Sequence, residues 1–101
     1  MGKRIEACPG VWRETLAVGE KLMVVRFTFA PGGKVPVHRH PYEQSSYVAA
    51  GRLRYTVAGA TEILNPGESR VIPGDVEHGA EALEEATAID SFTPVRPDYL
   101  D

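Results

Sequence analysis

The sequence lacks the features that would take the chain out of the cytoplasm or into a membrane. Its one cysteine, Cys8, cannot form an internal disulfide, which fits a reducing compartment. Apolar runs such as LMVV at 22–25 are far shorter than the roughly 20 residues that span a bilayer. The first ten residues lack the apolar stretch of a secretion signal. We therefore expect a cytoplasmic protein that makes no contact with membranes.

An excess of basic residues is also missing. The chain has 11 Lys and Arg against 14 Asp and Glu, a net charge of −3, and no basic cluster to neutralise phosphates, so we expect no nucleic-acid partner. Its 101 residues are typical of one domain, since single cores usually take about 100 to 200 residues. Because a short chain leaves much of its surface uncovered, we expect a homodimer, with residues 1–10 as an arm that is flexible or contacts the partner.

What the sequence does contain is a succession of short segments rich in β-branched and aromatic residues, separated by glycine and proline turns. The segment ALEEATAI (82–89) is the one alternative helical turn, but it lacks an N-cap and is too short to stand alone. An all-β sandwich or barrel is therefore expected. The predicted strands cover residues 13–18, 21–29, 34–40, 44–50, 52–58, 61–64, 68–73, 77–83 and 86–93.

Side chains alternate between the two faces of a strand, so residues of the same parity point the same way. His38 and His40 share a face on this argument, as do Gln44, Ser46 and Val48 after the Pro41 turn. If the inner face is chosen on each strand, one cavity is lined by His38, His40, Gln44, His78, Asp90 and Phe92.

The three histidines of the chain all fall at spacings that suit metal ligands. Imidazole is a good donor to zinc, nickel, copper and iron, and a site needs three or four donors that converge on one point. A single histidine such as His78 would more often be a surface or hydrogen-bonded core residue, but the three together favour one divalent transition-metal ion per chain. Glu43 is a competing ligand whose parity points it away from the cavity.

The spacing of these residues closely resembles the two motifs of the cupin superfamily. Motif one is matched by residues 32–51, as Gly32-x5-His38-x-His40-x3-Gln44-x6-Gly51, and motif two by 67–78, as Gly67-x5-Pro73-x-Asp75-x2-His78. The resemblance implies a double-stranded β-helix, the cupin jelly-roll barrel, over the single domain 1–101. It also implies a metal at the centre, bound by His38, His40, Gln44 and His78; Ni, Zn, Fe, Mn and Co all remain open.

Three positions depart from the usual cupin pattern. Gln44 stands where the commoner ligand is Glu, Asp75 where motif two usually has Gly, and Ala82 where it usually closes with Asn. The first change leaves the expected ligand set without a negative charge, which makes the ion a stronger Lewis acid.

The C-terminal segment IDSFTPVRPDYL (89–100) resembles that of small cupins of the KdgF type. The resemblance implies ring opening of 4,5-unsaturated uronate monosaccharides to linear keto-acids. Asp90 would then be the general acid/base, Arg96 the contact for the substrate carboxylate and Phe92 an apolar wall. Each residue also has a structural alternative, because Asp90 and Arg96 would make a good ion pair and Phe92 a core residue.

Two other classes of function stay open at this point. One is a different metal-dependent cupin enzyme, either a non-redox sugar isomerase or an iron-dependent dioxygenase. The other is a cupin module that binds a sugar or a metal without catalysis. One fold hosts many chemistries, so the fold alone does not separate them.

Overall fold

The computed structural model describes residues 2–101, and within that range the chain forms ten strands and one short 3-10 helix. Met1, the first residue of the expected arm, lies outside the described residues. In chain order the elements are β1 (Ile5–Cys8), β2 (Val11–Val18), β3 (Met23–Phe29), β4 (Lys34–His38), β5 (Glu43–Ala50), β6 (Leu53–Val57), β7 (Ala60–Leu64), β8 (Ser69–Ile72), β9 (His78–Ala82), β10 (Ala86–Thr93) and the 3-10 helix η1 (Pro97–Tyr99).

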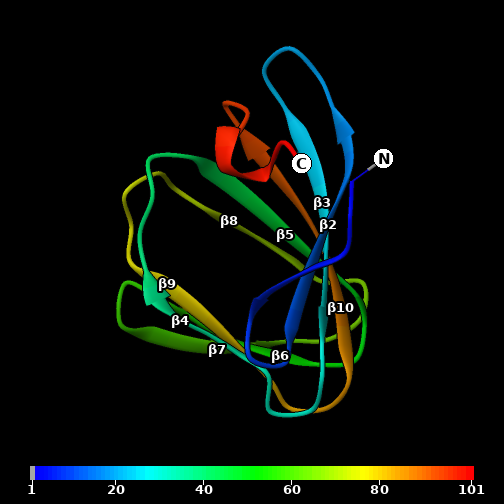
Figure 1. Ribbon diagram of the computed structural model, residues 1–101. Helices are drawn as coiled ribbons and strands as arrows, with labels where there is room; N and C mark the ends of the chain where they lie inside the picture. Colours follow the sequence, from blue (N-terminus) through cyan, green and yellow to red (C-terminus); the bar gives the residue numbers. More distant parts are fainter. Residues whose placement is uncertain (1) are drawn as a thin grey trace.

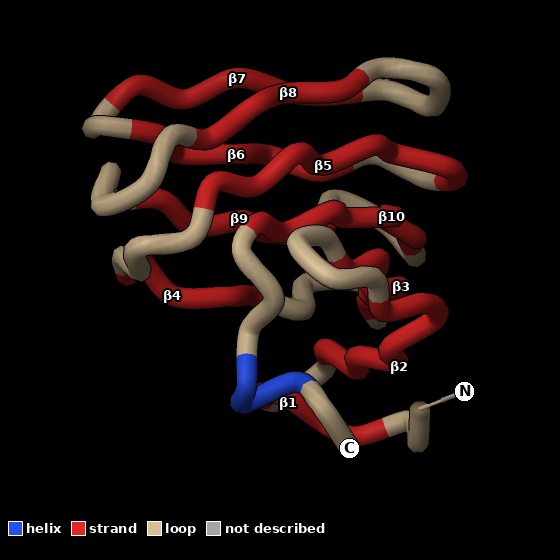
Figure 2. The backbone as a smooth tube through the Cα atoms, turned by 90° about the horizontal axis from the view of Figure 1, so that it is seen from above, coloured by secondary structure: helices blue, strands red, loops and turns tan. Residues whose placement is uncertain are grey.

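The strands form two antiparallel sheets that face each other. One sheet has six strands in the order β1-β2-β3-β10-β5-β8, and the other has four in the order β4-β9-β6-β7. Figure 1 shows the smaller sheet to one side of β2, β3 and β10, and Figure 2 shows the strands stacked as successive rungs. The all-β jelly-roll barrel expected from the sequence is confirmed.

The core lies between the sheets because the strands alternate in burial. On β3 the side chains of Met23, Val25, Phe27 and Phe29 are buried while those between them are not, and β10 follows the same period. Phe27 on β3 and Phe92 on β10 meet edge to face with ring centroids 6.4 Å apart. Period-2 patterning therefore chose the inner face of β10 correctly, with Asp90 and Phe92 on it.

The expected strands agree with the observed ones to within two residues at each end. Two elements were not expected. β1 forms inside the supposed arm 1–10 and pairs with β2, with Ile5 opposite Arg13. The helix η1 follows β10, and no helix within residues 2–101 is long and apolar enough to cross a membrane. A contact of the arm with a partner subunit stays a prediction.

Two turn residues explain how the motif loops close. Gly51 has φ +74°, and a Cβ atom there would collide with the carbonyl oxygen of Glu85, so only glycine fits between β5 and β6. Asp75 has φ +63°, a left-handed conformation that Asp tolerates better than most residues. Its backbone N–H donates to the carbonyl of His40 over 2.7 Å, which joins the second motif to the first.

Candidate metal centre

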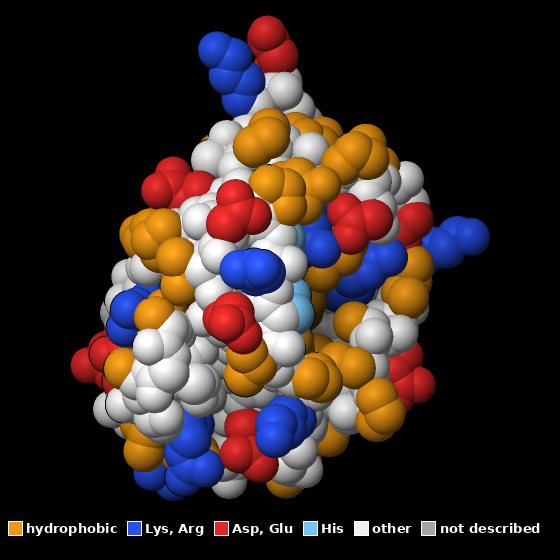
Figure 3. Space-filling model, turned by 90° about the vertical axis from the view of Figure 1, so that its left-hand side faces the viewer, with side chains coloured by type: hydrophobic (Ala, Val, Ile, Leu, Met, Phe, Trp, Pro, Cys, Tyr) orange, Lys and Arg blue, Asp and Glu red, His pale blue; other side chains and the backbone are white. Residues whose placement is uncertain are grey.

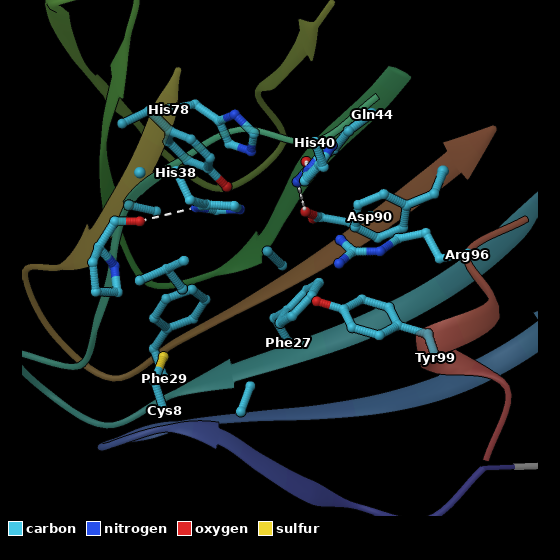
Figure 4. Close-up of a pocket in the computed structure, with 18 residues that line it drawn as sticks. Cys8, Phe27, Phe29, His38, His40, Gln44, His78, Asp90, Arg96 and Tyr99 are labelled. Carbon is cyan, nitrogen blue, oxygen red and sulfur yellow. Dashed lines mark hydrogen bonds between the residues drawn. The ribbon is translucent and has the colours of Figure 1, made fainter. Parts of the chain in front are cut away.

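A cavity of about 330 Å³ lies between the two sheets, and every residue predicted from the sequence to form the site lines it. Figure 3 shows histidine atoms at the bottom of a hollow in the surface, and Figure 4 shows how the side chains are distributed within it. Imidazoles and Gln44 gather at one end, beside Asp90 and Arg96, while Phe29 and Cys8 lie toward the other. The nominated lining residues are His38, His40, Gln44, His78, Asp90, Phe92 and Arg96.

The three histidines come from two adjacent strands and the loop that follows one of them. His38 ends β4 and is paired with His78, the first residue of β9, after a one-residue register shift that begins at Val35. His40 lies beyond the end of the strand, not on it as the alternation argument assumed. The three rings nevertheless converge, with one nitrogen from each within 4.8 Å of the others.

Each imidazole is oriented by a backbone carbonyl two residues away in the sequence. The Nδ1 atoms of His38, His40 and His78 lie 2.9, 3.1 and 2.8 Å from the carbonyl oxygens of residues 36, 42 and 76. A carbonyl accepts, so each Nδ1 carries a proton, and in the neutral ring the Nε2 atom then keeps a free lone pair. The Nε2 of His78 is buried and has no hydrogen-bond partner among residues 2–101, as expected of an atom that needs a ligand.

Gln44 is the expected fourth donor, and its position gives the clearest test of fit to a cation. Its Oε1 lies 3.1 Å from the Nε2 of His40. If the Nδ1 of His40 donates to the carbonyl of Tyr42, both of the facing atoms are acceptors, and two lone pairs directed at each other repel. A cation between them removes the conflict, so the chemistry of this donor set fits a divalent metal ion.

Asp90 lies next to Gln44 on the neighbouring strand, with a relative exposure of only 4%. Its Oδ2 accepts a hydrogen bond from Gln44 Nε2 at 2.6 Å and its Oδ1 one from Ser46 Oγ at 2.7 Å. Burial raises the pKa of Asp90 to about 7, although these two hydrogen bonds oppose the shift. The carboxyl group therefore titrates near neutrality, where a general acid or base is most effective.

Arg96 reaches the same cavity from the segment after β10. Its Nε and Nη2 donate to the carboxylate of Asp98, at 3.3 and 2.8 Å, and its guanidinium lies 3.8 Å from the centre of the Tyr99 ring. The alternative in which Arg96 forms an ion pair with Asp90 is therefore wrong, because a residue two positions later in the sequence takes that role.

Phe92 serves as core and cavity wall at once. It is 1% exposed and packs edge to face against Phe27 and Tyr99, yet its ring also lies 5.9 Å from that of His40 and lines the cavity. The competing ligand Glu43 is exposed, as its parity predicted.

Comparison with known proteins agrees with this geometry. A family model described as the cupin domain matches residues 25–91. The chain belongs to the cupin family. This cupin is 34% identical over 93 residues to the pectin degradation protein KdgF of Dickeya dadantii (strain 3937), a match that covers 90% of this chain and 84% of that protein.

Two solved structures resemble this cupin over almost its whole length. The structure of KdgF from Halomonas sp. superposes with a TM-score of 0.92 at 34% identity, covering 97% of this chain and 91% of that chain. An RmlC-like cupin from Shewanella frigidimarina NCIMB 400 gives a TM-score of 0.92 at 32% identity, covering 98% and 89%. The resemblance to KdgF-type cupins is confirmed.

The electrostatics of this cupin favour the neutral imidazole at His40 and His78. Burial lowers the pKa of His40, and the charge of Arg96 lowers it further. Burial also lowers the pKa of His78. Neutral imidazole is the form that binds a metal, so the protein environment and the donor geometry act in the same direction.

Several lining residues of this cupin were missed or left without a role in the sequence analysis. Tyr55, to which the sequence analysis gave no role, is a buried core residue that also lines the cavity. Its parity with the buried residues Leu53 and Val57 was the available signal. Tyr99 gave no signal, because alternation cannot be applied to residues outside a strand.

Proposed function

We propose that this cupin opens the ring of 4,5-unsaturated uronate monosaccharides to linear keto-acids, with one divalent transition-metal ion bound in the cavity. The observation that carries the proposal is the meeting of three histidine rings with Asp90 and Arg96 in one cavity, in a chain that is 34% identical to a KdgF protein over 90% of its length. Sugar acids of this kind have a carboxylate for Arg96 and hydroxyl groups for the metal.

The ion would be held by His38, His40, His78 and Gln44. When bound, it supplies a positive charge that polarises substrate oxygens and fixes their position. Three imidazoles and one carboxamide carry no charge, so none of the ion's charge is neutralised by its ligands. The identity of the metal is left open, because this donor set suits several divalent ions.

Arg96 binds the carboxylate of the substrate. A guanidinium has five N–H donors. In Arg96, Nε and Nη2 donate hydrogen bonds to Asp98, which leaves Nη1 without a hydrogen-bond partner among residues 2–101. Stacking on Tyr99 and the bond to Asp98 fix the plane of the group before substrate arrives. A guanidinium group whose orientation is fixed in advance loses little conformational entropy when it binds a carboxylate.

Asp90 moves the proton. Hydration of the enol ether puts a proton on C4 and a hydroxyl on C5, and the resulting hemiketal collapses when the bond between C5 and the ring oxygen breaks. Both steps need a group that gains and releases a proton near neutral pH, and the buried Asp90 with a pKa of about 7 has that property. Phe92 forms the apolar wall against the sugar.

The test is direct. Purified protein is added to freshly prepared unsaturated uronate, and the loss of absorbance from the conjugated double bond is followed against a blank without protein. Enzyme-dependent loss under anaerobic conditions supports the proposal. A binding module would leave the spontaneous rate unchanged, and a dioxygenase would require oxygen.

A homodimer in the cytoplasm stays a prediction from the sequence. Exposed apolar side chains on the outer face of the larger sheet support the dimer, with Tyr47 on β5 46% exposed and Val71 on β8 58% exposed. Light scattering on the eluting protein measures the mass and decides between monomer and dimer.

A further inference from the structure

A second set of polar contacts extends from Asp90 away from the metal ligands and across the barrel. Tyr55, on β6 of the smaller sheet, places its hydroxyl against Ser46 Oγ on β5 of the larger sheet. Ser46 in turn donates to Asp90 Oδ1 over 2.7 Å. Ser46 is 0% exposed and Tyr55 4%, so neither hydroxyl depends on bulk water for its hydrogen bonds.

While Asp90 is a carboxylate, the donors in this series of hydrogen bonds have a fixed direction. A serine hydroxyl has one proton, and Ser46 gives it to the carboxylate, so Tyr55 must donate to Ser46. Burial raises the pKa of Tyr55, with the charge of Asp90 adding to the effect, and the phenol therefore keeps the proton that it donates. The hydrogen bonds run from Tyr55 through Ser46 to Asp90.

Gln44 makes a hydrogen bond to the other oxygen of Asp90. Its Nε2 is committed to Asp90 Oδ2, which leaves Oε1 as the atom that faces His40. Each oxygen of Asp90 thus accepts one hydrogen bond from a buried side chain, and two such bonds fix both the position and the plane of the carboxylate. Turning that plane would release Gln44 from the orientation in which its oxygen faces the histidines.

We propose that Ser46 and Tyr55 are positioning residues for Asp90. They hold Asp90 in the rotamer that presents its carboxylate to the substrate, and in this rotamer Asp90 directs the oxygen of Gln44 toward the metal. The part that concerns turnover rests on the proposed function. Neither hydroxyl is a metal ligand or takes part in the reaction, and their effect reaches the site through Asp90.

The chain contains matched controls for both hydroxyl groups. Ser45 is the neighbour of Ser46 on the opposite face of β5, and Tyr47 is the next residue of that outer face. Neither side chain makes a hydrogen bond within residues 2–101. Ser45→Ala and Tyr47→Phe therefore remove the same atoms as Ser46→Ala and Tyr55→Phe without touching the cavity.

The experiment measures kcat and KM for these four variants with the protein as purified, and the visible absorption of each after loading with Co²⁺ alone. Ser46→Ala and Tyr55→Phe should lose about 10- to 100-fold in kcat, the range seen when partners of metal ligands are removed, with KM within about twofold. Their Co²⁺ bands should shift because Gln44 is released, and the controls should match the wild type in both readouts.

The outcomes separate this proposal from the proposed function. If kcat in both variants stays within about twofold of the wild type, the positioning role is overturned. If the wild type opens no uronate, the Co²⁺ bands decide alone: a shift confined to Ser46→Ala and Tyr55→Phe supports positioning, and unchanged bands overturn it. Should Ser46→Ala fail to fold, Tyr55→Phe carries the test, because phenylalanine keeps the volume of the ring.

Discussion

The two sheets orient their polar residues in different ways. In the smaller sheet and the loop after β4, each histidine ring is oriented by a backbone carbonyl two residues away. In the larger sheet, Gln44 and Asp90 are oriented by each other and by Ser46, that is, by side chains. A carbonyl remains whatever the side chain, so imidazole orientation is robust to substitution nearby, whereas the carboxamide and the carboxylate depend on particular neighbours.

This difference predicts that metal binding and turnover fail separately. Removing a histidine ring removes a donor outright. Changing a residue on β5 or β10 should instead leave most of the metal affinity in place and lower the rate, since only one of the four proposed ligands, Gln44, comes from that sheet.

The largest effect is expected from removing two of the rings together. His40→Ala with His78→Ala leaves His38 and Gln44 as the only proposed donors, too few for a stable site in a cavity open to water. Elemental analysis of protein purified without a polyhistidine tag should fall from near one transition-metal ion per chain to background. Metal content equal to the wild type in the folded double variant would refute the site.

Asp90→Asn should give the next largest effect, a fall in kcat of about 10²- to 10⁴-fold, the range for a lost general acid or base. The new carboxamide can still accept from Gln44 and donate to Ser46, whose hydroxyl then turns toward Tyr55. Folding, metal content and KM should therefore be close to the wild type. An early-melting variant that still turns over at the wild-type rate would show that Asp90 is structural.

Arg96→Ala should act mainly on substrate binding. Loss of a charge-assisted contact to a carboxylate is expected to raise KM by about 10- to 100-fold, with a smaller fall in kcat if the contact also orients the ring. Arg26→Ala is the control, since Arg26 forms a pair with Glu14 in which both side chains are partly exposed. Equal KM values for the two variants would exclude Arg96 as the carboxylate contact.

The sequence was sufficient for the strands β2–β10 and for the nominated site residues that face the cavity. Glycine and proline turns separated the strands, and the parity of Gln44, Ser46, Asp90 and Phe92 placed them on the inner face, as observed. His40 also reached the cavity, although its loop is fixed by a hydrogen bond from Asp75 that alternation does not describe.

Partners across the barrel were beyond the reach of the sequence. Alternation gives the face of a side chain but not which residue of the opposite sheet it meets, so the contact between Tyr55 and Ser46 was missed. The pairing of Arg96 with Asp98 was missed because both residues follow the last strand, in or beside a 3-10 helix that was not expected. β1 was missed because none of its side chains is fully buried and they show no alternating pattern.

The smallest effect is expected from Gln44→Glu, which tests whether the larger sheet contributes through charge or only through shape. A carboxylate oxygen is as good a donor as a carboxamide oxygen, so metal content should be unchanged. The substitution removes the N–H that donates to Asp90 and sets two carboxylates side by side, so one proton is shared between them. It also lowers the positive charge that faces the incoming uronate, and kcat/KM should fall by about tenfold, which corresponds to roughly 1.4 kcal/mol.

Glu43→Gln is the matched control, because the adjacent exposed residue undergoes the reverse change and should leave both metal content and rate as in the wild type. If Gln44→Glu keeps full activity, the neutrality of the ligand set is irrelevant to the reaction; if Glu43→Gln loses metal, the ligand on β5 has been assigned to the wrong residue.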